Sequence, residues 1–271
     1  MTTPDVPLRL ERTFEVQGTP AQVWEAIATA DGISSWFIRT EVEEREGGAI
    51  VVHMGDDMSS EGTVTGWDPP QRFAYIEPDW AALSGHEGAE VSPMATEFLV
   101  EATSGGTCVV RIVTSAFGTG AEWEQEFWDE MERMWVPFFD RLRLYLTHFP
   151  GQTATSLDVN VDLPTDEATL QVALRRAVGA DAPGQSIDVR GLTGLVEQVD
   201  DVQMLVRLTG PLPGVVAFVA FAKGPDVACA AIQGYFFSDD APAYVERITP
   251  EWKAWLESLG VSDPDGAKVG S

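Results

Sequence analysis

Hydrophobic and polar residues alternate at the start of the chain, and the spacing then becomes helical. Residues 8–16 place apolar side chains at every second position, apart from an irregularity at Arg12, and this pattern predicts a strand. Thr19 is a favourable N-cap and Pro20 suits a first helical position. We therefore predict a helix after the strand, ended by a break at residues 31–32.

The next part of the chain has the pattern of an antiparallel meander. A short second helix is expected over residues 33–37, and from about residue 40 to 115 short apolar segments alternate with turn residues. In the last segment Arg111 faces solvent, so alternation places Cys108 and Ile112 inward. The strands are predicted at residues 49–54, 62–67, 72–77, 96–102 and 107–115.

Residues 121–149 give the strongest periodic signal. Apolar residues recur there at spacings of three and four over nearly the whole segment, while charged residues cover the other face. This pattern predicts one long amphipathic helix. Pro137 lies inside it and is expected to kink it, because proline supplies no backbone N–H.

A strand, two short helices, a meander and a long helix follow one another as in a helix-grip domain. Several short motifs resemble the SRPBCC branch of activator-of-heat-shock-ATPase homologues over roughly residues 8–149. The resemblance implies an α+β fold, in which a curved antiparallel sheet surrounds a long C-terminal helix with an apolar cavity between them. It implies no fixed chemistry. The motifs are Pro20-Ala-Gln-Val-Trp-Glu-Ala-Ile, Trp36-Phe37, Gly47-Gly48, Gly62-Thr-Val-Thr-Gly-Trp-Asp-Pro-Pro-Gln-Arg-Phe-Ala-Tyr and Gly106-Thr107.

A second domain is expected after the small-residue stretch at 151–156. The cap, the three apolar residues and the closing glycine of residues 166–179 have the offsets of residues 19–32, which suggests a divergent repeat. This copy is shorter, so loops and a strand are expected to be missing. The predicted division is a helix-grip domain at 1–150, a shorter α+β domain with features of a degenerate helix-grip at 156–260, and a disordered tail at 261–271.

Composition narrows the classes of partner. The chain has 271 residues with 17 basic and 43 acidic side chains, a formal net charge of -26, which disfavours nucleic acid and anionic lipid surfaces. Residues 1–12 do not have the pattern of a secretory leader, and no apolar stretch has the length of a membrane span, so we expect a cytoplasmic protein without membrane contact. Cys108 and Cys229 have no metal-ligand or redox spacing and are expected to be reduced core residues.

Motifs that carry chemistry are missing from the sequence. It contains no phosphate-binding loop, dinucleotide fingerprint, nucleophile elbow or zinc spacing, so we predict no cofactor and no metal and identify no catalytic set. His53 lies in a predicted strand. Alternation directs either His53 or its neighbours Val52 and Met54 into the cavity, and a cavity histidine could act as a general base.

Aromatic and methionine side chains are the better clue to a site. Those that converge between the sheet and the long helix would form an apolar pocket for a small molecule, although packing of a plain core uses the same residues. Two alternatives stay open: a cyclase or hydratase with a cavity acid or base, and an interaction module that regulates a chaperone or another protein. The ligand and the oligomeric state are not predicted. The predicted ligand-binding residues are Trp36, Phe37, Phe73, Tyr75, Phe98, Met131, Met134, Trp135 and Phe138.

Overall fold

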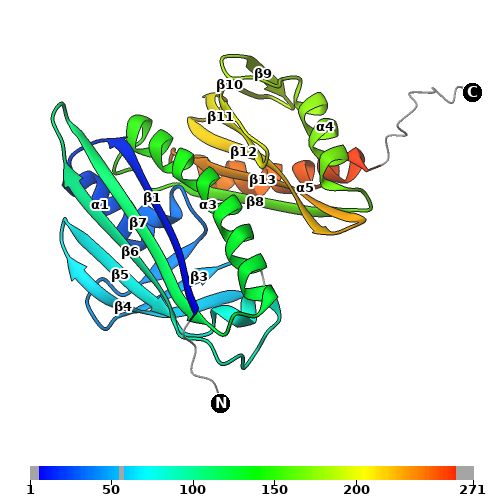
Figure 1. Cartoon of the computed structure of the whole chain (residues 1–271). Coiled ribbons are helices and arrows are strands. Elements are labelled where there is room, and N and C mark those ends of the chain that lie inside the picture. The colour runs from blue at the N-terminus through cyan, green and yellow to red at the C-terminus, as the bar shows by residue number, and fades with distance from the viewer. Residues whose placement is uncertain (1–5, 55–57, 261–271) are drawn as a thin grey trace, which may run out of the picture. The chain divides into compact units, whose positions relative to one another are not determined.

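The computed structural model describes residues 6–54 and 58–260, and the chain divides into two compact units (Figure 1). Unit 1 is Met1–Thr153 and unit 2 is Ala154–Ser271. Each unit has its own antiparallel sheet and is described by itself. The predicted tail at 261–271 lies outside the described residues.

Unit 1 contains one sheet of seven strands, in the order β1-β7-β6-β5-β4-β3-β2. The first strand therefore pairs with the last, and the strands from β2 to β7 form a continuous meander. The elements are β1 (Val6–Gln17), α1 (Pro20–Ala28), α2 (Ala30–Ser34), β2 (Thr40–Val42), β3 (Ala49–His53), β4 (Ser59–Asp68), β5 (Arg72–Glu77), the 3₁₀ helix η1 (Trp80–Ser84), β6 (Met94–Ala102), β7 (Thr107–Gly118) and α3 (Glu122–His148).

Side-chain caps determine where the two short helices after β1 begin. Thr19 and Gln22 form a reciprocal capping box at the start of α1, as the sequence suggested for Thr19. The predicted break at residues 31–32 was wrong by a few residues. Thr29 ends α1 and immediately caps α2, since its Oγ1 accepts a hydrogen bond from the Gly32 N–H at 3.1 Å. The short second helix therefore starts at Ala30, earlier than residues 33–37.

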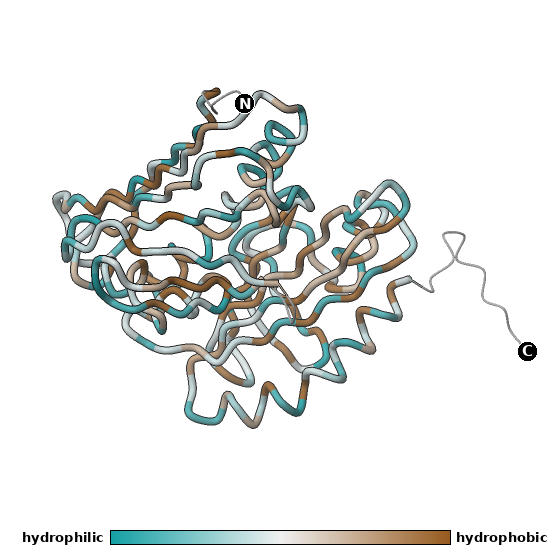
Figure 2. The backbone as a smooth tube through the Cα atoms, turned by 90° about the horizontal axis from the view of Figure 1, so that it is seen from below, coloured by the Kyte–Doolittle hydropathy of each residue, from teal (hydrophilic) through white to brown (hydrophobic). Residues whose placement is uncertain are grey.

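The long helix α3 supplies the other wall of unit 1. It runs for 27 residues through Pro137 and lies against β1 (Figure 1). Its buried face follows the three-and-four spacing of the sequence, with Phe138, Leu142 and Tyr145 all buried. On the sheet, Cys108 and Ile112 of β7 are buried as alternation predicted. Figure 2 shows the same alternation of hydrophobic and hydrophilic residues along the strands.

Unit 2 repeats this topology with one strand and one α-helix fewer and without a 3₁₀ helix among its described residues. Its sheet has six strands in the order β8-β13-β12-β11-β10-β9, so the first and last strands again pair. The last helix is continuous through Pro250. The elements are β8 (Thr155–Leu163), α4 (Glu167–Val178), β9 (Ser186–Val189), β10 (Leu192–Val199), β11 (Gln203–Gly210), β12 (Gly214–Gly224), β13 (Val227–Phe236) and α5 (Ala241–Leu259).

The core of unit 2 lies between its sheet and its two helices. Asp166 caps α4 through the Thr169 N–H at 2.8 Å, at the position that corresponds to Thr19 in unit 1. Leu170 and Leu174 of α4 and Trp252 of α5 pack with the sheet residues in one buried cluster. The shared order of elements and the matching cap support the interpretation of unit 2 as a shortened copy.

Candidate functional site

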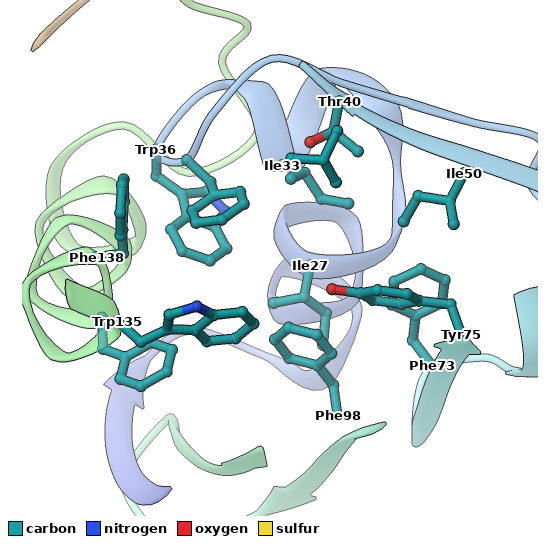
Figure 3. A pocket seen from close by; sticks show the side chains of 13 residues that line it. Ile27, Ile33, Trp36, Thr40, Ile50, Phe73, Tyr75, Phe98, Trp135 and Phe138 are labelled. Atoms are coloured by element: carbon teal, nitrogen blue, oxygen red, sulfur yellow. The ribbon is translucent and has the colours of Figure 1, made fainter. Parts of the chain in front are cut away.

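A small apolar cavity lies in unit 1 where α1, α2 and α3 face the meander (Figure 3). The sheet contributes residues from β2, β3, β5 and β6, and α3 contributes three residues at helical spacing. Eight of the thirteen lining side chains are aromatic, and Thr40 and Tyr75 bring the only hydroxyl groups of this lining. The lining residues are Ile27, Ile33, Trp36, Phe37, Thr40, Ile50, Val52, Phe73, Tyr75, Phe98, Trp135, Phe138 and Phe139.

The cavity is nearly filled by its own side chains. Its volume is about 20 Å³, which is close to the space that one water molecule needs. The Phe37 and Phe138 rings meet edge to face with centroids 4.6 Å apart, and the Phe73 and Phe98 centroids are 6.1 Å apart. A larger molecule can enter only if some of these rings move.

Phe37 and Trp135 are the lining side chains that can move most easily. They are the two partly exposed members of the lining, and their ring centroids lie 6.1 Å apart. Trp36 is held in place, because its Nε1 donates a hydrogen bond to the Ala26 carbonyl at 2.8 Å. The boundary between cavity and solvent therefore lies at Phe37 and Trp135.

A row of buried hydroxyl groups crosses the inner face of the sheet beside the cavity. Tyr75, Thr96 and Thr114 lie opposite one another on β5, β6 and β7, and each is buried. The Thr96 and Thr114 Oγ1 atoms are 3.2 Å apart, within hydrogen-bonding distance. Burial raises the pKa of Tyr75, and the nearby Glu77 raises it further. Tyr75 therefore keeps its proton and can serve as a donor.

Glu77 is a buried carboxyl group on the same inner face, two residues after Tyr75. It is 5% exposed, and the Ser60 hydroxyl of β4 donates a hydrogen bond to its Oε1. Burial raises the pKa of Glu77, and the hydrogen bond from Ser60 opposes that shift. Alternation along β5 directs Glu77 inward together with Phe73 and Tyr75.

We expect Glu77→Gln to change the pH dependence of stability. Because folding raises the pKa of Glu77, its protonated form is favoured in the folded state. The stability that it contributes is fully present below its ordinary pKa and is lost as the pH rises through the folded value. Urea unfolding of unit 1 should therefore show the free energy of the glutamine variant rising relative to that of the parent protein as the pH increases from 4 to 8.

The control for this comparison is Glu61→Gln, which removes an exposed carboxylate from the same region of the sheet. It accounts for the general effect of one negative charge fewer on an acidic protein. If the free energies of unfolding of the two variants differ from that of the parent protein by the same amount at every pH, burial does not govern the ionisation of Glu77.

Seven of the nine predicted site residues line the cavity. On α3 the lining residues are Trp135, Phe138 and Phe139, which share one helix face. Met131 lies on that face one turn earlier, where it packs in a separate cluster with Leu8, Leu10 and Trp80. Met134 precedes Trp135 by one residue, a rotation of about 100° around the helix, and it is not among the lining residues.

The residues that the prediction missed are mainly aliphatic. Ile27, Ile33 and Ile50 are buried in the lining, but in the sequence they are indistinguishable from ordinary core residues. Val52 was one of the two options on β3, and it is the one that lines the cavity. His53 lies on the other face of the strand, where its Nε2 is 3.1 Å from Glu41 Oε1. The cavity therefore contains no contribution from His53.

The long loop after β5 folds over the inner face of β1 rather than over this cavity. Trp80 of η1 is completely buried, and its Nε1 donates to the Ser92 carbonyl at 2.9 Å. Met94 and Trp128 pack in the same cluster, and the Trp128 Nε1 is buried without a hydrogen-bond partner among the described residues. Trp80 thus anchors part of this loop in the core of unit 1.

Within residues 6–54 and 58–260, no group of three acidic, histidine or cysteine side chains is arranged to hold a metal ion. Cys108 and Cys229 are both buried free thiols. None of the helices described in the structure is long and apolar enough to cross a membrane.

The order of elements in unit 1, with an apolar cavity between the sheet and the long last helix, defines a helix-grip domain of the SRPBCC superfamily. Residues 17–147 match the family described as "Activator of Hsp90 ATPase homolog 1-like protein". Unit 1 therefore belongs to this branch of the superfamily, as the motifs in the sequence indicated.

Several solved structures are similar to the chain. The di-domain ARO/CYC BexL from the BE-7585A biosynthetic pathway is 13% identical, with a TM-score of 0.42 over 95% of this chain and 100% of that one. DynU16, a putative protein in the dynemicin biosynthetic locus, is 17% identical, with a TM-score of 0.42 over 94% and 98%. The Aha1 dimer from Colwellia psychrerythraea is 16% identical, with a TM-score of 0.41 over 51% and 96%. No curated protein matches the chain.

Proposed function

We propose that unit 1 binds an apolar small molecule in the cavity between the sheet and α3. The observation that carries this proposal is the lining itself, in which eight aromatic rings surround an enclosed space with a few hydroxyl groups at its side. Binding sites for small molecules are commonly apolar and concave, with a small number of polar groups that orient the ligand. The family match supports such a module without naming its ligand.

The entrance in this proposal is the boundary at Phe37 and Trp135. Both side chains are partly exposed, so rotation away from the cavity costs less buried surface there than elsewhere in the lining. Trp135 also lies two residues before Pro137, which supplies no N–H to the hydrogen bonds of α3. A ligand would thus expand the cavity by displacing these rings and would occupy the space they leave.

Native mass spectrometry of the purified protein tests this function. We expect a species heavier than the polypeptide by the mass of one small molecule, which denaturation should release for identification. The matched sample is Trp135→Ala, because it keeps the buried lining and alters the entrance. A protein that carries no ligand, and that also fails to bind any member of a panel of apolar aromatic compounds, would contradict the proposal.

Binding of a protein partner is a second candidate, favoured by the small volume of the cavity and by the description of the matching family as an activator of an ATPase. In that case a partner should bind equally well whether or not the cavity is blocked. Pull-down with Val52→Phe, in which a larger ring fills the cavity, separates the two functions, since only ligand binding depends on that space.

A further inference from the structure

We propose that the Tyr75 hydroxyl donates a hydrogen bond to a carbonyl oxygen of the ligand, so that the preferred molecule is uncharged and carries a ketone group at the end that lies deepest in the cavity. This inference rests on the proposed function, because it assigns the specificity of the same cavity. It goes further in naming the side chain that orients the ligand and the chemical group which that side chain selects.

Tyr75 brings a hydroxyl group to the wall of the cavity. It is one of the lining residues on β5, and its side chain is buried. Figure 3 shows its hydroxyl oxygen directed into the cavity, on the side opposite Trp135 and Phe138 of α3. Because the partly exposed Trp135 lies at the entrance, a molecule that enters there brings its leading end to Tyr75.

The other polar groups of the buried lining already use their protons within the protein. The Thr40 hydroxyl donates to the Ile38 carbonyl at 2.9 Å, and the Trp36 Nε1 donates to the Ala26 carbonyl at 2.8 Å. Burial raises the pKa of Tyr75, so its hydroxyl keeps its proton at neutral pH. Tyr75 is therefore the donor that the buried end of the lining offers to a ligand.

The chemistry of the lining favours an uncharged acceptor. None of the thirteen lining side chains carries a charge, so a carboxylate placed among them would lose its water without gaining a counter-ion. Glu77 is close enough to raise the pKa of Tyr75, and it would repel a second anion. A ligand hydroxyl would bring a proton that needs an acceptor of its own, whereas a carbonyl oxygen needs only a donor. A ketone therefore matches Tyr75.

Two probes of matched shape test this inference: 2-acetylnaphthalene and 2-isopropenylnaphthalene, which differ by a carbonyl oxygen in place of a methylene group. Equilibrium dialysis gives the ratio of their dissociation constants for each protein. We expect Tyr75→Phe to weaken the binding of 2-acetylnaphthalene about tenfold, as the loss of one hydrogen bond would do, and to leave the binding of 2-isopropenylnaphthalene unchanged. The comparison of ratios between proteins cancels the different affinities of the two probes for water.

Tyr145→Phe is the matched control, because it removes the same atom from another buried tyrosine of unit 1. The Tyr145 hydroxyl donates to the Gln152 carbonyl at 3.1 Å, and Tyr145 is not among the residues that line the cavity. This variant should therefore keep the ratio of the parent protein. Unaltered affinity for 2-isopropenylnaphthalene shows that each variant is folded.

Infrared spectroscopy of the parent protein tests the same hydrogen bond without a substitution. The carbonyl stretching band of bound 2-acetylnaphthalene should lie at a lower frequency than the band of the free ketone in hexane. An unshifted band, or a ratio of dissociation constants that Tyr75→Phe leaves unaltered, would overturn the role of Tyr75 and leave the cavity function intact. Failure of the parent protein to bind either probe would instead remove the proposed function itself, and this inference with it.

Discussion

Replacing Phe73 by alanine should lower the free energy of unfolding of unit 1 by about 3–5 kcal/mol, the usual cost of deleting a fully buried phenylalanine ring. Phe73 is 0% exposed and lies at the centre of the aromatic cluster on the inner face of the sheet. Its ring centroid is 5.7 Å from that of Trp67, 5.6 Å from that of Tyr75 and 6.1 Å from that of Phe98. Removing the ring would leave a cavity among these neighbouring rings, which is why the expected loss is large.

Hydrogen exchange of unit 1 peptides at increasing urea concentrations measures this effect without assuming that both units unfold together. The control is Phe117→Ala at the end of β7, where the ring is 52% exposed and the expected loss is within about 0.5 kcal/mol. Similar losses for the two variants would show that the cluster around Phe73 is not the core of the unit.

The fold could be predicted well because its signals are periodic. The spacing of α3 fixed its length to within a residue at each end, and alternation placed the inward face of β7 correctly. The start of α2 was predicted wrongly because one residue can serve two helices. Thr29 can end one helix and cap the next, which hides the start of α2 in the sequence.

The site was harder to predict, since lining a cavity and filling a core use the same residue types. The aromatic residues of the sequence indicate the region in which the cavity lies, and Trp135, Phe138 and Phe139 share one face of α3. Met131 lies on the same face of α3 one turn earlier, so the sequence pattern includes it as well. Only the structure shows that Met131 packs with Trp80 instead of lining the cavity. Glu77 could have been found by continuing the alternation of Phe73 and Tyr75 by one more step.

Filling the cavity should weaken binding of an apolar probe. Val52 is 5% exposed and lines the cavity from β3, so the larger ring of Val52→Phe would take the remaining space and oppose its expansion. We expect the affinity for 2-methylnaphthalene to fall at least about tenfold, which corresponds to about 1.4 kcal/mol of binding free energy. The matched variant is Val51→Phe, which adds the same ring on the other face of the strand.

The most direct test of ligand binding in this cavity is the dissociation constant of 2-methylnaphthalene, measured by equilibrium dialysis for the parent protein and for these two variants. The hydrogen exchange of unit 1 shows whether each variant is folded. Our account predicts that Val51→Phe binds the probe like the parent protein, while a folded Val52→Phe binds it at least about tenfold more weakly. Equal dissociation constants for all three proteins would place the bound molecule elsewhere and contradict the account.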